Sequence, residues 1–226
     1  MDYQLSKRLS KVLDYIDKDD LVADIGADHG YLSLEMLNIG VKFVQVVENK
    51  IEPLKRAQLT LKNHENVKYS LSDGISDLDE LINTVTICGM GGLNIVEILS
   101  NDLPTAKRLN KIILQANSKL FELREFLNNN SFQIIDEAII EEKGCFYEII
   151  VTKYEANGTF DLSYPEKYFG PILMNNQNVT FSNKYKKRRD EYKNILKSSI
   201  SKETEINNLK NQIELIETYV KGDWND

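Results

Sequence analysis

The stretch that decides the fold is L-V-A-D-I-G-A-D-H-G-Y-L, residues 21–32. Leu21–Ile25 reads as a short buried strand with an aspartate near its end, and helix-permissive residues begin at Tyr31. The loop between them contains Gly26 and Gly30. Because glycine has no Cβ, a ligand can approach such a loop closely, and the N–H groups that begin the next helix face that ligand. The stretch therefore predicts a ligand-binding strand–loop–helix unit.

Length and composition are those of an ordinary globular chain. The 226 residues suffice for one full core with a smaller appendage. A net charge of −7 argues against a protein that coats nucleic acid non-specifically. The charge is unevenly distributed, because residues 1–154 hold 17 Lys+Arg against 24 Asp+Glu, whereas residues 155–226 hold 11 of each. The acidity therefore belongs to the N-terminal part.

The cysteines and histidines give no sign of a disulfide framework or a metal site. Cys88 and Cys145 lie in strand-like runs and fit buried free thiols in a reducing compartment. His29 and His64 are the only histidines of the sequence, and no metal-ligand spacing exists, so we expect no metal. The N-terminus lacks the apolar core of a secretory signal, and no apolar run approaches the roughly 18–20 residues that span a bilayer. We expect a cytoplasmic protein without a membrane partner.

Strand and helix patterns alternate along the first two-thirds of the chain. Apolar residues from Leu5 to Ile16 recur at helical spacing. Four strands are expected at 21–25, 42–48, 66–71 and 111–115, and a further one begins the stretch T-V-T-I-C-G-M-G-G at 84–92 and runs into a glycine-rich turn. Helices lie between the strands, one of them short and near 77–82. Two longer runs, 132–141 and 145–154, predict a hairpin. The pattern predicts an α/β, Rossmann-like fold with a mostly parallel seven-stranded sheet, helices on both faces and an antiparallel strand at one end, as methyltransferase sheets often have.

The C-terminal third has a different organisation. We expect residues 1–154 to form the ligand-binding domain, 155–181 a connector rich in turn formers and aromatics, and 182–226 a helical domain. A heptad pattern begins at Phe181, and its seam is polar around Ser198–Ser201. We predict two helices folded back as a coiled-coil-like hairpin. One continuous dimerising helix is the alternative, so we expect a monomer with a dimer left open.

The loop after the first strand has the form D-x-G-x-x-x-G, with Asp24, Gly26 and Gly30. The dinucleotide fingerprint G-x-G-x-x-G would place a glycine where Asp24 stands. A carboxylate there would repel a pyrophosphate, but it suits a ligand that carries an ammonium group and no phosphate. S-adenosylmethionine is such a ligand. For this motif alone, an ordinary tight turn is the alternative.

Polar or glycine-rich residues also end the next three strands. Glu48 could accept hydrogen bonds from both ribose hydroxyls. Asp73 could accept a hydrogen bond from the adenine amino group, while Gly74 leaves room for the ring. Residues 89–92 would lie near the sulfonium. Taken alone, Glu48 could be a helix N-terminal charge and Asp73-Gly74 a turn. All these ends meet at the carboxyl edge of one parallel sheet, where such folds bind ligands. The predicted cofactor-binding residues are Asp24, Gly26, His29, Glu48, Asn49, Asp73, Gly74, Gly89, Met90 and Gly91.

Six short motifs spread over nearly the whole chain share one resemblance. They are L-S-K-R-L at 5–9, D-I-G-A-D-H-G-Y-L at 24–32, C-G-M-G-G at 88–92, I-L-Q-A-N at 113–117, G-C-F-Y-E at 144–148 and F-G-P at 169–171. Together they resemble the bacterial tRNA (adenine-22-N1)-methyltransferase family, TrmK. Ala116 and Cys88 depart from the family's usual Pro and Ala, and neither change removes a group that must react. The resemblance implies methyl transfer from S-adenosylmethionine to N1 of an adenine in tRNA.

The fourth strand agrees with that chemistry. It carries Cys-Gly-Met-Gly where methyltransferases of exocyclic amino groups commonly carry N/D-P-P-Y/F. Ring N1 already has a lone pair, so an obligatory general base is not required, and alignment can supply roughly 7–11 kcal/mol of barrier lowering. Because N1 lies on the pairing edge, the adenine must first be unpaired and turned into the pocket.

Asp28 is the candidate catalytic residue. We expect it to accept from the adenine N6 amino group or to steady the developing positive charge; an N-cap for the following helix is the alternative. Tyr31 could stack on a base, or it could be a core tyrosine. Further substrate-binding candidates are Arg8, Gln115 and Asn117 in the pocket and Lys186, Lys187, Arg188 and Arg189 in the one dense basic run, which a solvated helix face would also explain.

Two other functions are compatible with parts of the sequence. A small-molecule methyltransferase would use the same cofactor pocket but has no evident use for the basic helical tail. A non-catalytic cofactor-binding or interaction module would not need the intact set of strand-end motifs. We therefore expect an enzyme whose cofactor is S-adenosylmethionine and whose partner is tRNA.

Overall fold

The computed structural model describes residues 4–158, 161–197, 202–222 and 224. The chain forms two compact units, residues 1–161 and residues 162–226. Within the described ranges, no helix is long and apolar enough to cross a membrane.

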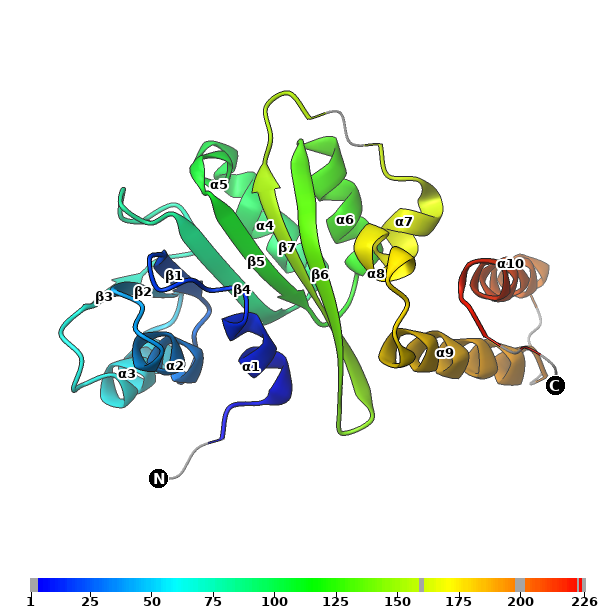
Figure 1. Ribbon diagram of the computed structural model, residues 1–226, viewed down its shortest axis with the longest axis horizontal. Coiled ribbons are helices and arrows are strands. Elements are labelled where there is room, and N and C mark those ends of the chain that lie inside the picture. The colour runs from blue at the N-terminus through cyan, green and yellow to red at the C-terminus, as the bar shows by residue number, and fades with distance from the viewer. Residues whose placement is uncertain (1–3, 159–160, 198–201, 223, 225–226) are drawn as a thin grey trace. The chain divides into compact units, whose positions relative to one another are not determined.

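The first unit is built on one seven-stranded sheet in the order β3-β2-β1-β4-β5-β7-β6 (Figure 1). The strands are β1 (Leu21–Ile25), β2 (Phe43–Glu48), β3 (Val67–Leu71), β4 (Thr84–Met90), β5 (Lys111–Ala116), β6 (Phe132–Glu142) and β7 (Cys145–Tyr154). The first five are parallel, and β7 is antiparallel to both of its neighbours. The predicted fold class is confirmed. The chain leaves β1 towards β2 on one side and returns at β4 on the other, and ligands bind at such a switch point.

Helices cover both faces of this sheet (Figure 1). One layer contains α1 (Lys7–Leu13), α2 (Tyr31–Asn38) and α3 (Ile51–Thr60), and the other contains α4 (Gly92–Asn101), α5 (Leu103–Arg108) and α6 (Leu120–Asn129). Successive strand residues point to opposite faces: Ile113 packs with the first layer, and Ile112 and Leu114 pack with the second. Because both faces are covered, the inner parallel strands β1, β2 and β5 are buried along nearly their whole length, whereas the edge strand β3 is partly exposed.

A buried ion cluster joins the terminal hairpin to α6. Arg124 is fully buried, and its Nε donates to Glu137 Oε1 of β6 over 2.8 Å. Its Nη2 donates to Glu148 Oε2 of β7 over 2.5 Å. Removing one partner of such a cluster leaves a buried charge uncompensated, which destabilises a protein by about 3–5 kcal/mol. The cluster therefore fixes the two strands that extend the sheet beyond β5.

Three local expectations for the first unit were wrong. Residues 77–82 form turns, because Asp79 Oδ1 accepts from the Leu81 N–H over 3.1 Å and so competes with a helix. The helix α5 was not expected, although Asp102 caps it by accepting from the Thr105 N–H over 3.1 Å. Cys145 is exposed at the hairpin turn rather than buried.

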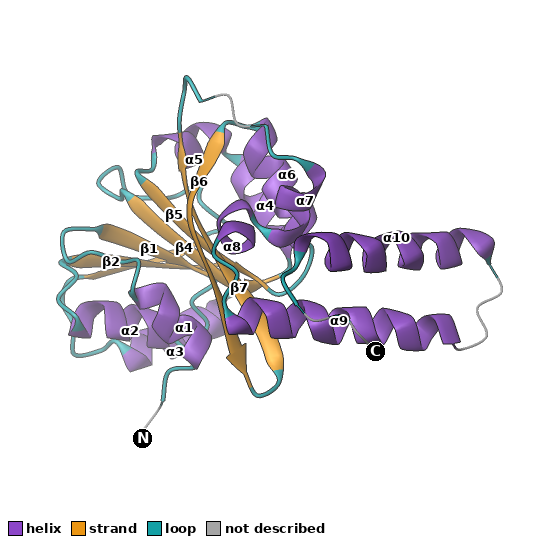
Figure 2. Cartoon of the chain, turned by 45° about the vertical axis from the view of Figure 1, so that its right-hand side comes forward, coloured by secondary structure: helices purple, strands orange, loops and turns teal. Residues whose placement is uncertain are grey.

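The second unit consists of α7 (Tyr164–Phe169), α8 (Pro171–Asn175), α9 (Val179–Lys197) and α10 (Glu203–Tyr219). Residues 155–181, expected as a connector, thus hold two short helices and the start of α9. The aromatic rings of Phe169 and Phe181 each lie 4.7 Å from that of Tyr185, which gives the unit its own small core. The helices α9 and α10 lie side by side as a hairpin (Figure 2), so the predicted fold-back is confirmed; the predicted break at 198–201 lies outside the described residues.

Candidate active site

A buried carboxylate ends the central strand β1. Asp24 is only 2% exposed, and its Oδ2 accepts from Ser33 Oγ of α2 over 2.7 Å. Its Oδ1 accepts from Thr86 Oγ1 of β4 over 2.9 Å. Burial raises the pKa of Asp24 to about 6; the two hydroxyl hydrogen bonds oppose this rise, and the charge of Glu48 adds to it. This carboxylate therefore lacks a cationic partner among the groups that shift its pKa, and a ligand ammonium group would supply one.

The loop after β1 packs directly against the last residue of β4. Gly26 has φ +71°, and a Cβ at this position would overlap the terminal methyl of Met90. The Gly26 N–H donates to the Val47 carbonyl over 2.9 Å, which ties the same loop to β2. The positive φ favours glycine at this position, and any larger residue would also displace the Met90 methyl.

Two cavities open at the carboxyl edge of the sheet, and both reach Gly26. The first, of about 270 Å³, is lined by Ile25, Gly26, Val47, Glu48, Asn49, Ser72, Asp73, Gly74, Met90, Asn94, Glu97, Ile98 and Asn101. The second, of about 240 Å³, is lined by Arg8, Leu9, Asp24, Gly26, Ala27, Asp28, His29, Tyr31, Leu32, Cys88 and Gly89. The two cavities have similar volumes and share Gly26 in their linings, so they form two halves of one site that meet at this glycine.

The first cavity collects the acids that end β2 and β3. Glu48 is nearly buried, its Oε1 accepts from the Asp28 N–H, and burial raises its pKa. The Ser72 N–H donates to the Glu48 carbonyl over 2.9 Å. The Asn49 Nδ2 lies 3.4 Å from Asp73 Oδ1. The ends of adjacent strands are thus linked to one another around this cavity.

Helix α4 contributes a wall that the sequence analysis missed. Asn94, Glu97, Ile98 and Asn101 line the first cavity and are spaced by three, four and seven residues. This spacing puts them on one face of a helix. The available signal was a set of polar residues at helical spacing directly after the glycine-rich turn.

Asp28 lies in the second cavity and is not a helix cap. The helix α2 begins after Gly30, which is its left-handed N-cap residue without a side-chain hydrogen bond, so the capping alternative is wrong. Asp28 Oδ1 accepts from Arg56 Nη2 over 2.7 Å, and its Oδ2 lies 3.7 Å from His29 Nε2. The His29 and Tyr31 rings stack at 5.5 Å with an 11° interplanar angle. An exposed carboxylate and a pair of stacked rings therefore share the rim of this cavity.

Of the remaining predicted site residues, some line a cavity and others lie behind the residues that do. Arg8 lines the second cavity, and its Nη1 donates to Gln115 Oε1. Asn117 and Gly91 are absent from the described lining of both cavities. The Asn117 Nδ2 donates to the Gly89 carbonyl over 2.8 Å, and Gly91 is the N-cap of α4. Asn117 thus holds the backbone of Gly89, and Gly91 begins α4.

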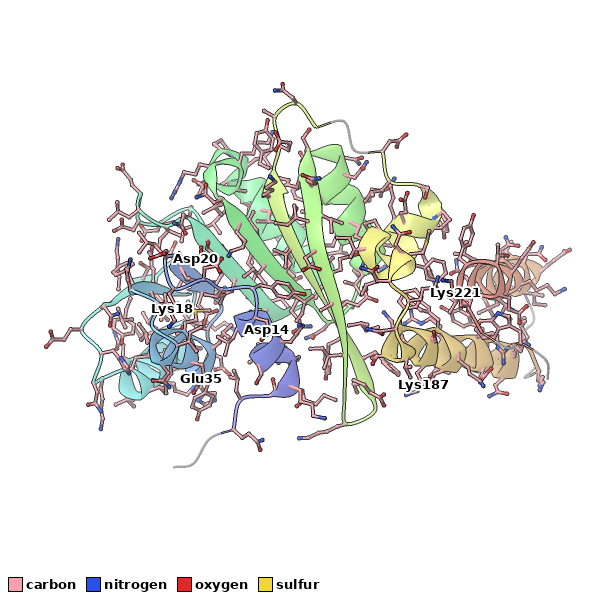
Figure 3. The ribbon with its side chains drawn as sticks, in the orientation of Figure 1. Asp14, Lys18, Asp20, Glu35, Lys187 and Lys221 are labelled. Atoms are coloured by element: carbon pink, nitrogen blue, oxygen red, sulfur yellow. The ribbon has the colours of Figure 1, made fainter. Side chains whose placement is uncertain are left out.

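The basic run on α9 contains both exposed and buried residues. Lys186, Lys187 and Arg188 are exposed, and Figure 3 labels Lys187. Arg189 is 1% exposed, its Nη2 lies 2.7 Å from Asp190 Oδ1, and its guanidinium lies 4.7 Å from the Trp224 ring. Its burial removes Arg189 from the predicted phosphate-contacting set.

The residues that could hold a metal ion are scattered. In the part of the chain that the structure describes, no group of three or more His, Cys, Asp or Glu side chains is arranged around a common point.

A sheet in this order, closed by an antiparallel hairpin and with acids ending its first two strands, defines the Rossmann-like class I methyltransferases. The chain belongs to the TrmK family of tRNA (adenine(22)-N(1))-methyltransferases, whose family model matches residues 22–218. This family carries out S-adenosylmethionine-dependent methylation of N1 of adenine 22 in tRNA. The chain is therefore such an enzyme, and the small-molecule and non-catalytic alternatives are set aside.

Relatives and solved structures agree with this assignment. The tRNA (adenine(22)-N(1))-methyltransferase of Bacillus subtilis is 29% identical over 92% of this chain and 91% of its own. The Streptococcus pneumoniae protein Sp1610, solved in complex with S-adenosyl-L-methionine, superposes with a TM-score of 0.87 at 30% identity, covering 96% of this chain and 100% of that one. Mycoplasma capricolum TrmK, solved with S-adenosyl-homocysteine, has a TM-score of 0.82 at 26% identity, covering 96% and 98%.

Proposed function

We propose that the first cavity binds the adenosine part of S-adenosylmethionine and that the second binds its amino-acid end. Glu48 is placed to accept from the ribose hydroxyls, and Asp73 with Gly74 to receive the adenine ring. Asp24 and Arg8 line the second cavity and complement the ammonium and carboxylate of the cofactor. The observation that carries the proposal is the meeting of both cavities at Gly26, which would place the sulfonium between them.

The complexes of related proteins support this cofactor. The S. pneumoniae protein is complexed with S-adenosyl-L-methionine, and the M. capricolum protein holds the product S-adenosyl-homocysteine. Both share the fold over nearly the whole of this chain. A cofactor of the same chemistry is therefore the natural occupant of the paired cavities here.

The target adenine would enter at the rim of the second cavity. Its N1 lone pair attacks the methyl carbon, the bond from that carbon to sulfur breaks, and the base is left as a cation. The enzyme therefore needs alignment and charge stabilisation more than proton removal. Asp28 at the rim could accept from the N6 amino group, and the stacked His29 and Tyr31 rings offer a face to the base.

The first prediction tests the reaction and its position. With S-adenosylmethionine labelled on the methyl group, the protein should label a tRNA that has adenine at position 22. The same tRNA with guanine at that position should stay unlabelled, and nuclease digestion with mass spectrometry should identify 1-methyladenosine. Equal labelling of both tRNAs, or labelling of small molecules in its place, would contradict the proposal.

The second prediction concerns Asp28. Asp28→Ala should slow single-turnover methyl transfer by about 10- to 100-fold, because it removes a group that stabilises the transition state. The affinity for S-adenosylmethionine should change by less than about threefold, because the residue faces the base in this proposal.

Arg56→Ala is the matched control, because it removes the ion-pair partner and leaves the Asp28 carboxylate in place. Its transfer rate should stay within about threefold of the unmodified enzyme. Equal losses in the two variants would mean that only the surface ion pair matters, and normal turnover of Asp28→Ala would end the proposal for this residue.

We propose that the exposed basic residues of α9 contact tRNA phosphates and that the protein acts as a cytoplasmic monomer. Lys186 and Lys187 add positive charge to a chain whose first 154 residues are acidic. Because α9 pairs with α10 of the same chain, the hairpin needs no second copy to cover its seam. Phosphate contacts of this kind fix register without reading sequence.

The third prediction follows from those contacts. The double variant Lys186→Ala/Lys187→Ala should weaken tRNA binding about tenfold at low salt and reduce the slope of log affinity against log salt by between about one and two. The control Lys210→Ala/Lys221→Ala removes the same charge from exposed positions of the same unit, and Figure 3 labels Lys187 and Lys221. An equal effect of both double variants would show that net charge, and no defined contact, explains the binding.

A further inference from the structure

Gln115 is a buried polar residue behind the wall of the second cavity. It lies in β5, is fully buried, and pairs with Cys88 of β4 in the sheet. A buried amide needs partners for its oxygen and its nitrogen. Gln115 has three partners: Arg8 in α1, Gly89 in β4, and Asn117 directly after β5.

The first partner is a bulge in β4. The register passes from Cys88↔Gln115 to Met90↔Ala116, so Gly89 has no opposite residue in β5. Gly89 has φ +77°, and its N–H donates to Gln115 Oε1 over 3.1 Å. A bulge re-aims the strand at a functional site, and here a side chain from the neighbouring strand holds the bulged peptide.

The other two partners complete a closed set of hydrogen bonds. Gln115 Oε1 also accepts from Arg8 Nη1, and its Nε2 donates to Asn117 Oδ1 over 3.1 Å. Asn117 in turn donates from Nδ2 to the Gly89 carbonyl over 2.8 Å. The backbone N–H of Gly89 is therefore held by Gln115, and its backbone carbonyl is held by Asn117.

This bulge separates the two cavities. Gly89 lines the second cavity, and the next residue, Met90, lines the first. The methyl of Met90 occupies the space over Gly26 that a side chain there would need. The position of the Gly89 peptide thus sets the wall between the cofactor's two ends, next to the proposed place of the sulfonium.

We infer that Gln115 is a positioning residue for methyl transfer: it sets the Arg8 guanidinium and the Gly89 bulge at the junction of the two cavities. The inference rests on the assignment of the cavities proposed above. Gln115 lines neither cavity in the described part of the chain, so it acts through Arg8 and Gly89, which it holds by hydrogen bonds. A displacement of about 1 Å at such a junction can slow a reaction on the order of 100-fold.

The test compares Gln115 with a matched buried amide elsewhere in the same sheet. Gln45 in β2 is fully buried, donates to Ser70 Oγ and to the Asp77 carbonyl, and accepts from the Asp79 N–H. It lines neither cavity in the described part of the chain. Gln45→Met should therefore lower the melting temperature about as much as Gln115→Met while the transfer rate stays within about threefold of the unmodified enzyme.

For Gln115→Met, the single-turnover rate at saturating cofactor and tRNA should fall by about 30-fold or more. Gln115→Glu keeps both acceptor contacts, to Arg8 and to the Gly89 N–H, but loses the bond to Asn117 Oδ1, because a carboxylate does not donate. It should therefore restore the rate in part, to within about tenfold of the unmodified enzyme. Gln115→Asn keeps the amide, but its shorter side chain cannot reach Arg8 and the Gly89 N–H together. Its transfer rate should therefore be about tenfold below that of the unmodified enzyme. The asparagine variant decides the question if the methionine variant does not fold.

Equal rates of the Gln115 and Gln45 variants, or a glutamate variant as slow as the methionine variant, would overturn the inference. These results are distinct from failure of the proposed function. In that case the unmodified enzyme would leave adenine 22 unmethylated, or Asp24→Asn would bind S-adenosylmethionine as tightly as the unmodified enzyme.

Discussion

The burial of the Asp24 carboxylate is the constraint on which the rest of the site depends. An acid in this position is tolerated because two hydroxyls, Ser33 Oγ and Thr86 Oγ1, each satisfy one of its oxygens. These hydroxyls come from the helix that follows β1 and from the strand beside it, so the carboxylate also locks the loop between them. Desolvation still raises its pKa to about 6, so a cation that binds beside this carboxylate would stabilise its charged form. The cofactor's ammonium group is that cation in our account.

The wall between the cavities depends on the same edge of the sheet. The Gly89 bulge interrupts the regular pairing of β4 and β5, and Gln115 and Asn117 take over the hydrogen bonds that the sheet no longer makes. The cluster of Arg124, Glu137 and Glu148 fixes the hairpin beyond β5. Strands and paired amides thus set the geometry, while Asp28 stays exposed at the rim of the second cavity, where we propose that the base enters.

Much of this arrangement could be predicted from the sequence, because it follows from local patterns. Alternating strand and helix signals predict the sheet, and the acids and glycines at the strand ends predict most of the residues that line the two cavities. What the sequence did not show depends on contacts between distant residues. Arg189 looked like part of a basic patch, but its burial with Asp190 and Trp224 follows only from the packing of the second unit. The α4 wall and the partners of Gln115 likewise depend on the fold.

The most direct test of the central claim is calorimetric titration of S-adenosylmethionine at pH 6, in two buffers that differ in ionisation enthalpy. The cofactor's own amino group is already protonated at this pH. If its ammonium group binds ionised Asp24, the pKa of that carboxyl falls on binding, and the unmodified enzyme should release about half a proton per cofactor bound. Asp24→Asn should bind more weakly and release almost none. No proton release from the unmodified enzyme, or equal release from both, would contradict the account.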